Sequence, residues 1–148
     1  MSGTRIVQSK EAHMKKIIIG GILSAIVIII MGMLFGAASS EMYKMSPKTL
    51  WKPMGGNWFT EMIILDLVTG FILAGGYSLV KKCVPGQKLQ KGLCYGLLVF
   101  VVGPFLGLTM TYLTMAVRTK LIAVWALNGF VNYILSGLIF AFIDEKIS

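Results

Sequence analysis

Four long runs of apolar residues, separated by short polar segments with glycine and proline, set the pattern of this sequence. Each run is long enough to cross the hydrocarbon core of a bilayer as a helix, which takes about 20 mainly apolar residues. The pattern predicts helices over residues 17–38, 58–81, 92–117 and 121–143. We therefore expect an all-α integral membrane protein, an antiparallel bundle of four transmembrane helices with short loops, which forms a single domain over residues 1–148.

The remaining segments are polar. Residues 1–16 carry four basic side chains and one acidic one, and we expect them to form a cytoplasmic N-terminal segment. Residues 39–57 form the longest connection and contain Trp51, while Trp58 follows directly. Because tryptophan is favoured at the level of the lipid headgroups, this connection is expected to be an interfacial loop.

Composition and charge agree with a membrane protein. Of the 148 residues, 56% are hydrophobic and 14% are charged, and the net charge is +8. The basic residues gather at the ends of the apolar runs and no nucleic-acid-binding motif accompanies them, so we expect the lipid bilayer and not nucleic acid as the partner. Four spans place nine Lys and Arg residues on the side of the termini and five on the other side. The positive-inside rule then predicts that both termini lie in the cytoplasm.

One carboxylate, Asp66, lies within an apolar run, about eight residues from the outer end of its predicted helix. A charged carboxylate at that depth costs about 2.5–3.5 kcal/mol on insertion scales, so it should be protonated or find hydrogen-bond donors. Counting about 1.5 Å of rise per residue places further polar side chains at a similar depth. We therefore expect an intramembrane polar cluster of Asp66, Thr109, Tyr112, Asn128 and, nearer the midplane, Asn132.

Two interpretations of Asp66 stay open. It binds a cation or relays protons, with neighbouring Asn and Thr side chains completing the site, or it is a hydrogen-bonded pin that fixes helix register or pairs with Arg118 or Lys120. The sequence favours the pin, because a single acid without a second buried ionisable group makes a poor proton path.

Small residues spaced for one helix face predict where the helices pack closely. The predicted packing positions are Gly32 and Gly36 in the first helix, Gly70 and Ala74 in the second, and Gly96, Gly103 and Gly107 in the third. Pro104 follows Gly103 and should kink the third helix, because proline removes a backbone hydrogen bond and crowds the preceding turn.

The side chains that support metal or covalent chemistry are few. His13, Cys83 and Cys94 are expected on one side of the membrane, but their spacing matches no zinc-ligand pattern. No histidine lies within a predicted helix as a haem ligand, and no nucleophile triad or phosphate loop is present. We therefore expect no metal, no cofactor and no enzymatic activity.

Several motifs together resemble a known group of proteins. LWKPM lies before the second predicted helix, GFILAGGY within it, KGLCYGLL and PFLGLTMTYLTM in the third helix, and WALNGFVNYILSG in the fourth. They resemble a group of small bacterial membrane proteins with four transmembrane helices and unknown function. The resemblance covers residues 50–142 and implies the architecture, without an activity or ligand to carry over.

The expected function follows from this architecture. We expect a non-catalytic inner-membrane protein that acts through helix–helix contacts, as an accessory subunit of a larger membrane complex or as a homo-oligomer. The first alternative is a small oligomeric transporter or channel for protons or cations that uses Asp66. The second is a protein that binds lipid or another apolar cofactor between the glycine-rich helix faces.

Overall fold

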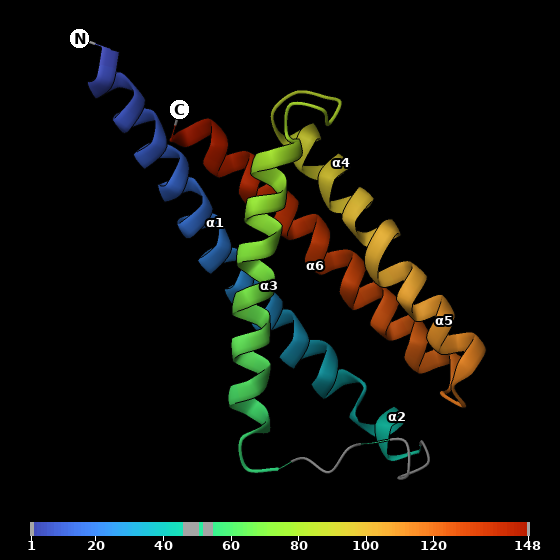
Figure 1. Cartoon of the computed structure of the whole chain (residues 1–148). Coiled ribbons are helices and arrows are strands. Elements are labelled where there is room, and N and C mark those ends of the chain that lie inside the picture. Colours follow the sequence, from blue (N-terminus) through green and yellow to red (C-terminus); the bar gives the residue numbers. More distant parts are fainter. Residues whose placement is uncertain (1, 46–50, 52–54, 148) are drawn as a thin grey trace.

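The chain folds into helices joined by turns (Figure 1). A computed structural model describes residues 2–45, 51 and 55–147, with side chains from Lys10 onward, and no strand occurs in these ranges. The elements are α1 (Ser2–Ala38), α2 (Ser40–Lys44), α3 (Trp58–Val80), α4 (Leu89–Phe100), the π-helical turn η2 (Val101–Phe105), α5 (Leu106–Thr114) and α6 (Thr119–Lys146). Four helical stretches are long and apolar enough to cross a membrane: Lys10–Ala38, Trp58–Val80, Leu89–Thr114 and Thr119–Lys146.

The helix bounds differ from the predicted ones mainly at polar ends. α1 begins at Ser2, whereas the sequence predicted a separate polar segment up to residue 16. That segment is rich in Lys, Gln, Glu, Ala and Met, which favour helix, so the helix continues through it. α3 matches its predicted range apart from its last residue, and α6 is longer at both ends.

The connection predicted over residues 39–57 contains a short helix, α2, at its start. Residues 46–50 and 52–54 of this connection lie outside the described residues. The third apolar stretch begins at Leu89 and ends at Thr114, where the backbone turns extended at Met115 (φ −120°, ψ 142°), before the predicted end at residue 117.

The predicted irregularity at Pro104 takes the form of a π-helical turn over Val101–Phe105. Proline lacks a backbone N–H and crowds the preceding turn, so the regular α-helical hydrogen-bond ladder cannot pass through it unchanged. A π-helical turn holds one extra residue, and each residue turns a helix by about 100°, so the faces before and after η2 do not align.

The four long helices pack in the spatial order α3, α1, α6, α4–α5. α1 packs against both α3 and α6, and α6 packs against both α1 and α4, with neighbours running antiparallel (Figure 1). A closed bundle would also pair α3 with α4 and α5 along their length. Here that pair meets only near the end that carries the termini, so the bundle is closed at this end and open at the other.

The closed end contains the core. Leu73, Ala74, Tyr77, Tyr95, Phe140 and Ala141 form one buried cluster from α3, α4 and α6. The Tyr95 hydroxyl donates a 2.7 Å hydrogen bond to the carbonyl oxygen of Leu73 and so links α4 to α3. Ser24 of α1 donates a 2.7 Å hydrogen bond to Ser136 of α6, and both side chains are almost fully buried. The helices that meet in the core are thus joined by polar contacts as well as by packing.

Backbone contact at small residues accompanies this core. A Cβ atom on Gly70 would collide with the carbonyl oxygen of Gly21 and lie 2.9 Å from the backbone nitrogen of Ala25. Gly92 and Gly137 face each other in the same way between α4 and α6. Small residues allow helix backbones to approach until van der Waals contact extends along both, which is a main source of helix association in lipid.

The predicted packing positions divide between the two ends of the bundle. Gly70, Ala74 and Gly96 lie at helix contacts. The packing prediction is wrong within this chain for the other four glycines, because a Cβ there would meet nothing within 4 Å: Gly32, Gly36, Gly103 and Gly107. The first two follow the point where α1 crosses its neighbours, and the last two lie in or after the π-helical turn that rotates the helix face.

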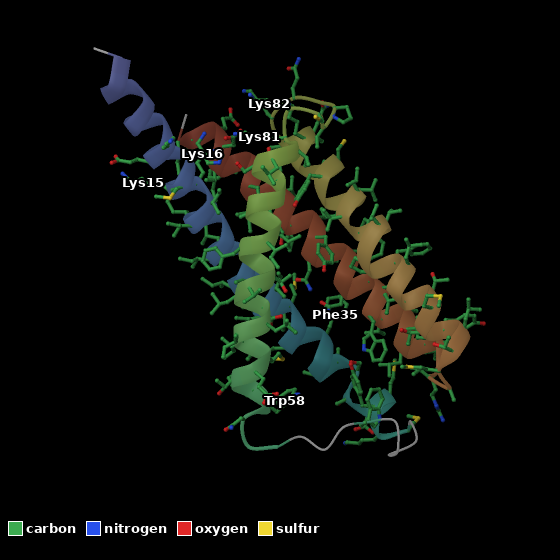
Figure 2. The ribbon with its side chains drawn as sticks, viewed as in Figure 1. Lys15, Lys16, Phe35, Trp58, Lys81 and Lys82 are labelled. Atoms are coloured by element: carbon green, nitrogen blue, oxygen red, sulfur yellow. The ribbon has the colours of Figure 1, made fainter. Side chains whose placement is uncertain are left out.

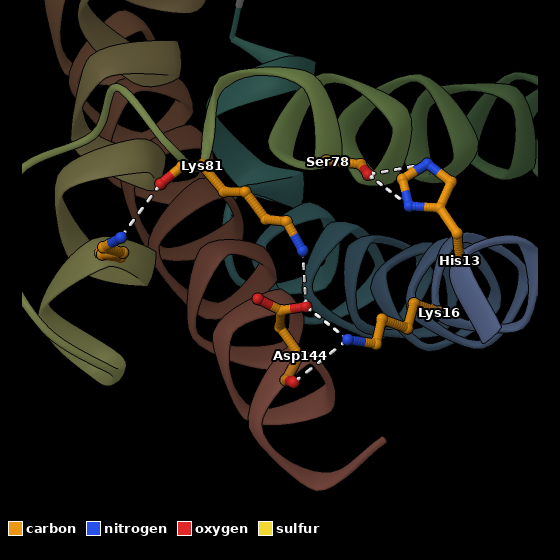
Figure 3. A network of polar contacts seen from close by, with 6 residues as sticks. His13, Lys16, Ser78, Lys81 and Asp144 are labelled. Carbon is orange, nitrogen blue, oxygen red and sulfur yellow. Dashed lines mark hydrogen bonds and ion pairs between the residues drawn. The ribbon is translucent and has the colours of Figure 1, made fainter. Parts of the chain in front are cut away.

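One carboxylate ties three helices together at the closed end (Figure 3). Asp144 Oδ1 of α6 accepts hydrogen bonds from Lys16 Nζ of α1 at 2.8 Å and from Lys81 Nζ, after α3, at 2.7 Å. Lys91 of α4 donates to the carbonyl oxygen of Lys81 at 3.2 Å, and Ser78 lies 3.2 Å from the His13 ring nitrogen Nε2. Lysines gather at this end, whereas Phe35 and Trp58 lie toward the opposite one (Figure 2).

An aromatic cluster lies at the open end. The Trp125 indole of α6 donates a hydrogen bond to the Tyr43 hydroxyl of α2, and Trp51 completes the cluster. The ring centroids of Tyr43 and Trp51 lie 5.2 Å apart, and those of Trp51 and Trp125 lie 6.2 Å apart. The connection before α3 is therefore anchored to the side of α6.

The glycine contacts predict a contrast between two single substitutions. In Gly96→Ala the new Cβ would lie 2.9 Å from the Cα of Ile134, so we expect the free energy of unfolding to fall by about 1–3 kcal/mol. In the matched Gly32→Ala variant the Cβ meets nothing, and stability should hold or rise by up to about 1 kcal/mol through helix propensity. Thermal melting of the two variants in detergent measures the difference, and equal shifts would contradict the packing.

Candidate functional site

A cleft of about 400 Å³ lies between the diverging helices of the open end. α3, α6, α1 and the third apolar stretch all contribute to its walls, and two of these wall elements, α3 and α5, share no extensive contact. The lining residues are Ile28, Leu65, Asp66, Thr69, Pro104, Gly107, Leu108, Trp125, Asn128, Gly129, Asn132 and Tyr133. Toward the termini the buried aromatic core follows, so the cleft ends within the bundle.

Asp66 is the only Asp, Glu, Lys, Arg or His among the described residues that line this cleft. The side chain is half-buried on α3 and forms no hydrogen bond or ion pair with any described residue. Tyr133 of α6 lines the same cleft. The pin interpretation is therefore not supported, because neither hydrogen-bond donors nor Arg118 or Lys120 hold the carboxylate within the described chain.

Asn132 supplies a second polar group without a partner. Its side chain is 7% exposed, and its Nδ2 donates a 2.9 Å hydrogen bond to Asn128 Oδ1, one helical turn earlier on α6. Asn132 Oδ1 is buried and has no hydrogen-bond partner. An unsatisfied buried acceptor costs about 1–3 kcal/mol, so a donor that enters the cleft would recover a substantial free energy.

Three of the five predicted cluster residues line the cleft together, namely Asp66, Asn128 and Asn132. The other two lie elsewhere, and this part of the prediction is wrong. Thr109 is exposed and donates to the carbonyl oxygen of Phe105, and Tyr112 is 55% exposed. Depth along a helix does not determine which face a residue occupies, and the π-helical turn further changes the face after residue 105.

Sequence reasoning missed Thr69, Trp125 and Tyr133. Thr69 follows Asp66 by three positions on α3, and its hydroxyl donates to the carbonyl oxygen of Leu65 at 2.8 Å. Trp125, Asn128 and Asn132 are spaced by three and four positions on α6. That spacing marks one helix face, and it was the signal available in the sequence.

The side chains considered for metal binding are dispersed. His13 contacts Ser78 at the closed end, and among the described residues no three His, Cys, Asp or Glu side chains come together. Cys83 and Cys94 are free thiols that line a separate apolar groove of about 700 Å³ between the end of α3 and α4. The described chain thus offers one polar cleft with unpartnered groups, and its chemistry is that of a single anion with neutral hydrogen-bond acceptors.

Comparison of the chain with protein-family models, with curated proteins and with solved structures returned no match. The side chains of the cleft are therefore the basis for a functional proposal.

The unpartnered state of Asp66 leads to a stability prediction. We expect Asp66→Leu to leave the free energy of unfolding unchanged or to raise it, because the carboxylate has no partner to lose and leucine suits its apolar neighbours. Tyr95→Phe, which removes the buried bond to Leu73, should instead cost about 1 kcal/mol. Thermal melting in detergent compares the two, and a loss in Asp66→Leu as large as in Tyr95→Phe would restore the pin interpretation.

Proposed function

We propose that this chain is a multi-pass integral membrane protein of the bacterial inner membrane, with both termini in the cytoplasm. Four long apolar helices support this, and so do the large apolar side chains exposed on them, such as Leu79 (82% exposed) and Ile72 (68%). Such a surface is unfavourable in water and favourable in lipid. The lysine-rich end beside the termini supports the orientation.

Within that setting we propose that the protein binds a cation in the cleft at Asp66, as a carrier or cation-binding protein without catalytic activity. The observation that carries this is the pair of unpartnered groups, the Asp66 carboxylate and Asn132 Oδ1, on the walls of one open cleft. A positive charge with N–H donors, or a cation with direct oxygen coordination, complements both groups at once. Intramembrane carboxylates that lack a partner within the protein are typical of substrate and ion pathways.

The shape of the cleft favours a carrier over a pore. The buried cluster around Tyr77, Tyr95 and Phe140 separates the cleft from the end that carries the termini. A continuous water-filled path would have to displace these rings. Binding from one side, followed by a change in helix packing, avoids that cost.

A second candidate is the function expected from the sequence, helix contact with a partner subunit or with a second copy. Gly32 and Gly36 support it, because they lie on α1 with nothing packed against them, beside exposed apolar residues such as Leu34. Small residues with open space are suited to a partner helix in lipid. Native mass spectrometry of the detergent-extracted protein tests this through the number and identity of the bound chains.

Cation binding is tested by carbodiimide labelling of Asp66 in liposomes. Dicyclohexylcarbodiimide reacts with carboxyl groups in apolar surroundings, and a bound cation should shield Asp66. The panel contains Na⁺, K⁺, Mg²⁺, trimethylammonium and N,N-dimethylhexylammonium. We expect at least one of them to slow the labelling at least about fivefold, which corresponds to a free-energy change of about 1 kcal/mol. Labelling of Glu61, at the first turn of α3, is the internal control.

The outcome is read by mass spectrometry of the peptide that contains Asp66. Fragmentation of this peptide separates a label on Asp66 from one on Glu61, and Asp66→Asn should abolish the label at position 66 alone. If no member of the panel protects Asp66, the proposed cation site is excluded.

The orientation is tested with the native thiol of Cys83, which is exposed at the end of the bundle that carries the termini. In a Cys94→Ala background, a membrane-impermeant maleimide should label Cys83 in inside-out vesicles and not in intact spheroplasts. Gly55→Cys in a background without other cysteines lies at the opposite end and should give the reverse pattern. Labelling of Cys83 in spheroplasts would contradict the proposed topology.

A further inference from the structure

We infer that the cleft takes a monovalent organic cation with an apolar substituent, an alkylammonium amphiphile, which enters from the lipid between α3 and α5. This inference rests on the proposed cation site and specifies its ligand. It follows from four properties of the cleft, which are its charge, its supply of ligand atoms, its walls and its opening.

The charge of the cleft matches one positive charge. Asp66 is the only Asp, Glu, Lys, Arg or His among the described residues on its walls, so a bound monovalent cation is neutralised by the carboxylate and a divalent one is left with an excess charge. An excess charge in apolar surroundings is strongly unfavourable. The charge of the cleft therefore favours a monovalent cation over a divalent one, whatever the shape of the ligand.

The oxygen atoms of the cleft suit an ammonium group better than calcium or magnesium. Calcium takes six to eight oxygen ligands and magnesium six, mostly from several carboxylates or retained water. Here the cleft offers the Asp66 carboxylate and Asn132 Oδ1, which have no partner, and the Thr69 hydroxyl and Asn128 Oδ1, which each already form one hydrogen bond. An ammonium group needs only as many acceptors as it has N–H bonds, and this supply is sufficient for it.

The walls complement an organic body. A volume of about 400 Å³ lies in the range of sites for small organic molecules and far exceeds a bare ion. Leu65 and Leu108 line the cleft as apolar surfaces, and Trp125 and Tyr133 add aromatic rings. An aromatic face within about 6 Å of a cation contributes about 0.5–2 kcal/mol, so the rings favour an ammonium group further.

The proposed entrance lies between α3 and α5, on the side of the bundle. α3 and α5 make no extensive contact with each other, and the third apolar stretch beside the opening is the least buried of the four. A molecule that partitions into the bilayer through an apolar chain therefore reaches the cleft directly, at an effective concentration well above that in water. A hydrophilic cation of the same charge lacks this route.

A matched set of three compounds separates charge from apolar character. N,N-dimethylhexylammonium has both, trimethylammonium has the charge alone, and hexanol has the chain alone. As tertiary ammonium ions, the two cations form no amide with an activated carboxylate. In the carbodiimide assay we expect dimethylhexylammonium to protect Asp66 at a concentration at least tenfold lower than trimethylammonium, and hexanol not to protect it.

Two variants test the remaining contacts. Asn132→Leu removes the unpartnered acceptor and should raise the protecting concentration of dimethylhexylammonium about tenfold, while Tyr133→Phe keeps the ring and should change it less than threefold. Thr109→Ala lies outside the cleft and serves as the matched control with an unchanged value. Gel filtration in detergent verifies that each variant is folded before it is assayed.

The possible outcomes are distinct. If K⁺ or trimethylammonium protects as well as dimethylhexylammonium, the cation site stands and the organic ligand is excluded. If hexanol protects equally, the chain alone accounts for binding, and the ligand inference is overturned. If no cation protects, the inference and the proposed function fall together.

Discussion

Direct contact between helix backbones at small residues is the constraint on which the rest of this structure depends. Gly70 lies against Gly21, and Gly92 lies against Gly137, with so little space that no larger residue fits at either contact. In lipid the hydrophobic effect does not drive helices together, so such contacts supply much of the association. Because they are concentrated toward the end that carries the termini, the helices meet there and diverge toward the other end.

The polar side chains also differ between the closed end and the open end of the bundle. At the closed end Asp144, Tyr95 and Ser24 all have partners on other helices, and the contacts hold those helices together. At the open end Asp66 and Asn132 Oδ1 have none. Other polar groups of the open end do have partners, as Trp125 has in Tyr43, so the unpartnered groups gather at the cleft.

The periodicity and length of the apolar runs were enough to predict the helical architecture. The apolar runs and the position of Pro104 follow from local chemistry, and the range of α3 was predicted almost to the residue. The arrangement of the helices was not predictable from the same pattern, because small residues mark every helix and the sequence does not say which pairs meet. Gly32 and Gly70 look alike in the sequence, yet only Gly70 faces another helix within this chain.

The site could be predicted in part. Asp66 stands out as the carboxylate within an apolar run, and Asn128 and Asn132 lie at a matching depth. Thr109 and Tyr112 were predicted at a similar depth, yet they do not line the cleft. The position of a residue along a helix does not determine the face on which it lies. The sequence also could not show whether Asp66 has a hydrogen-bond partner, because that depends on how far the neighbouring helices diverge.

The indole of Trp125 belongs both to the wall of the cleft and to the aromatic cluster with Tyr43 and Trp51. One side of it contributes to the cleft, and its N–H is bonded to Tyr43, in the short helix that precedes α3 along the chain. A displacement of this ring by an occupant of the cleft would pull on α2 and strain or break that bond. The hydrogen bond between Trp125 and Tyr43 thereby couples the wall of the cleft to α2, a helix that does not line the cleft itself.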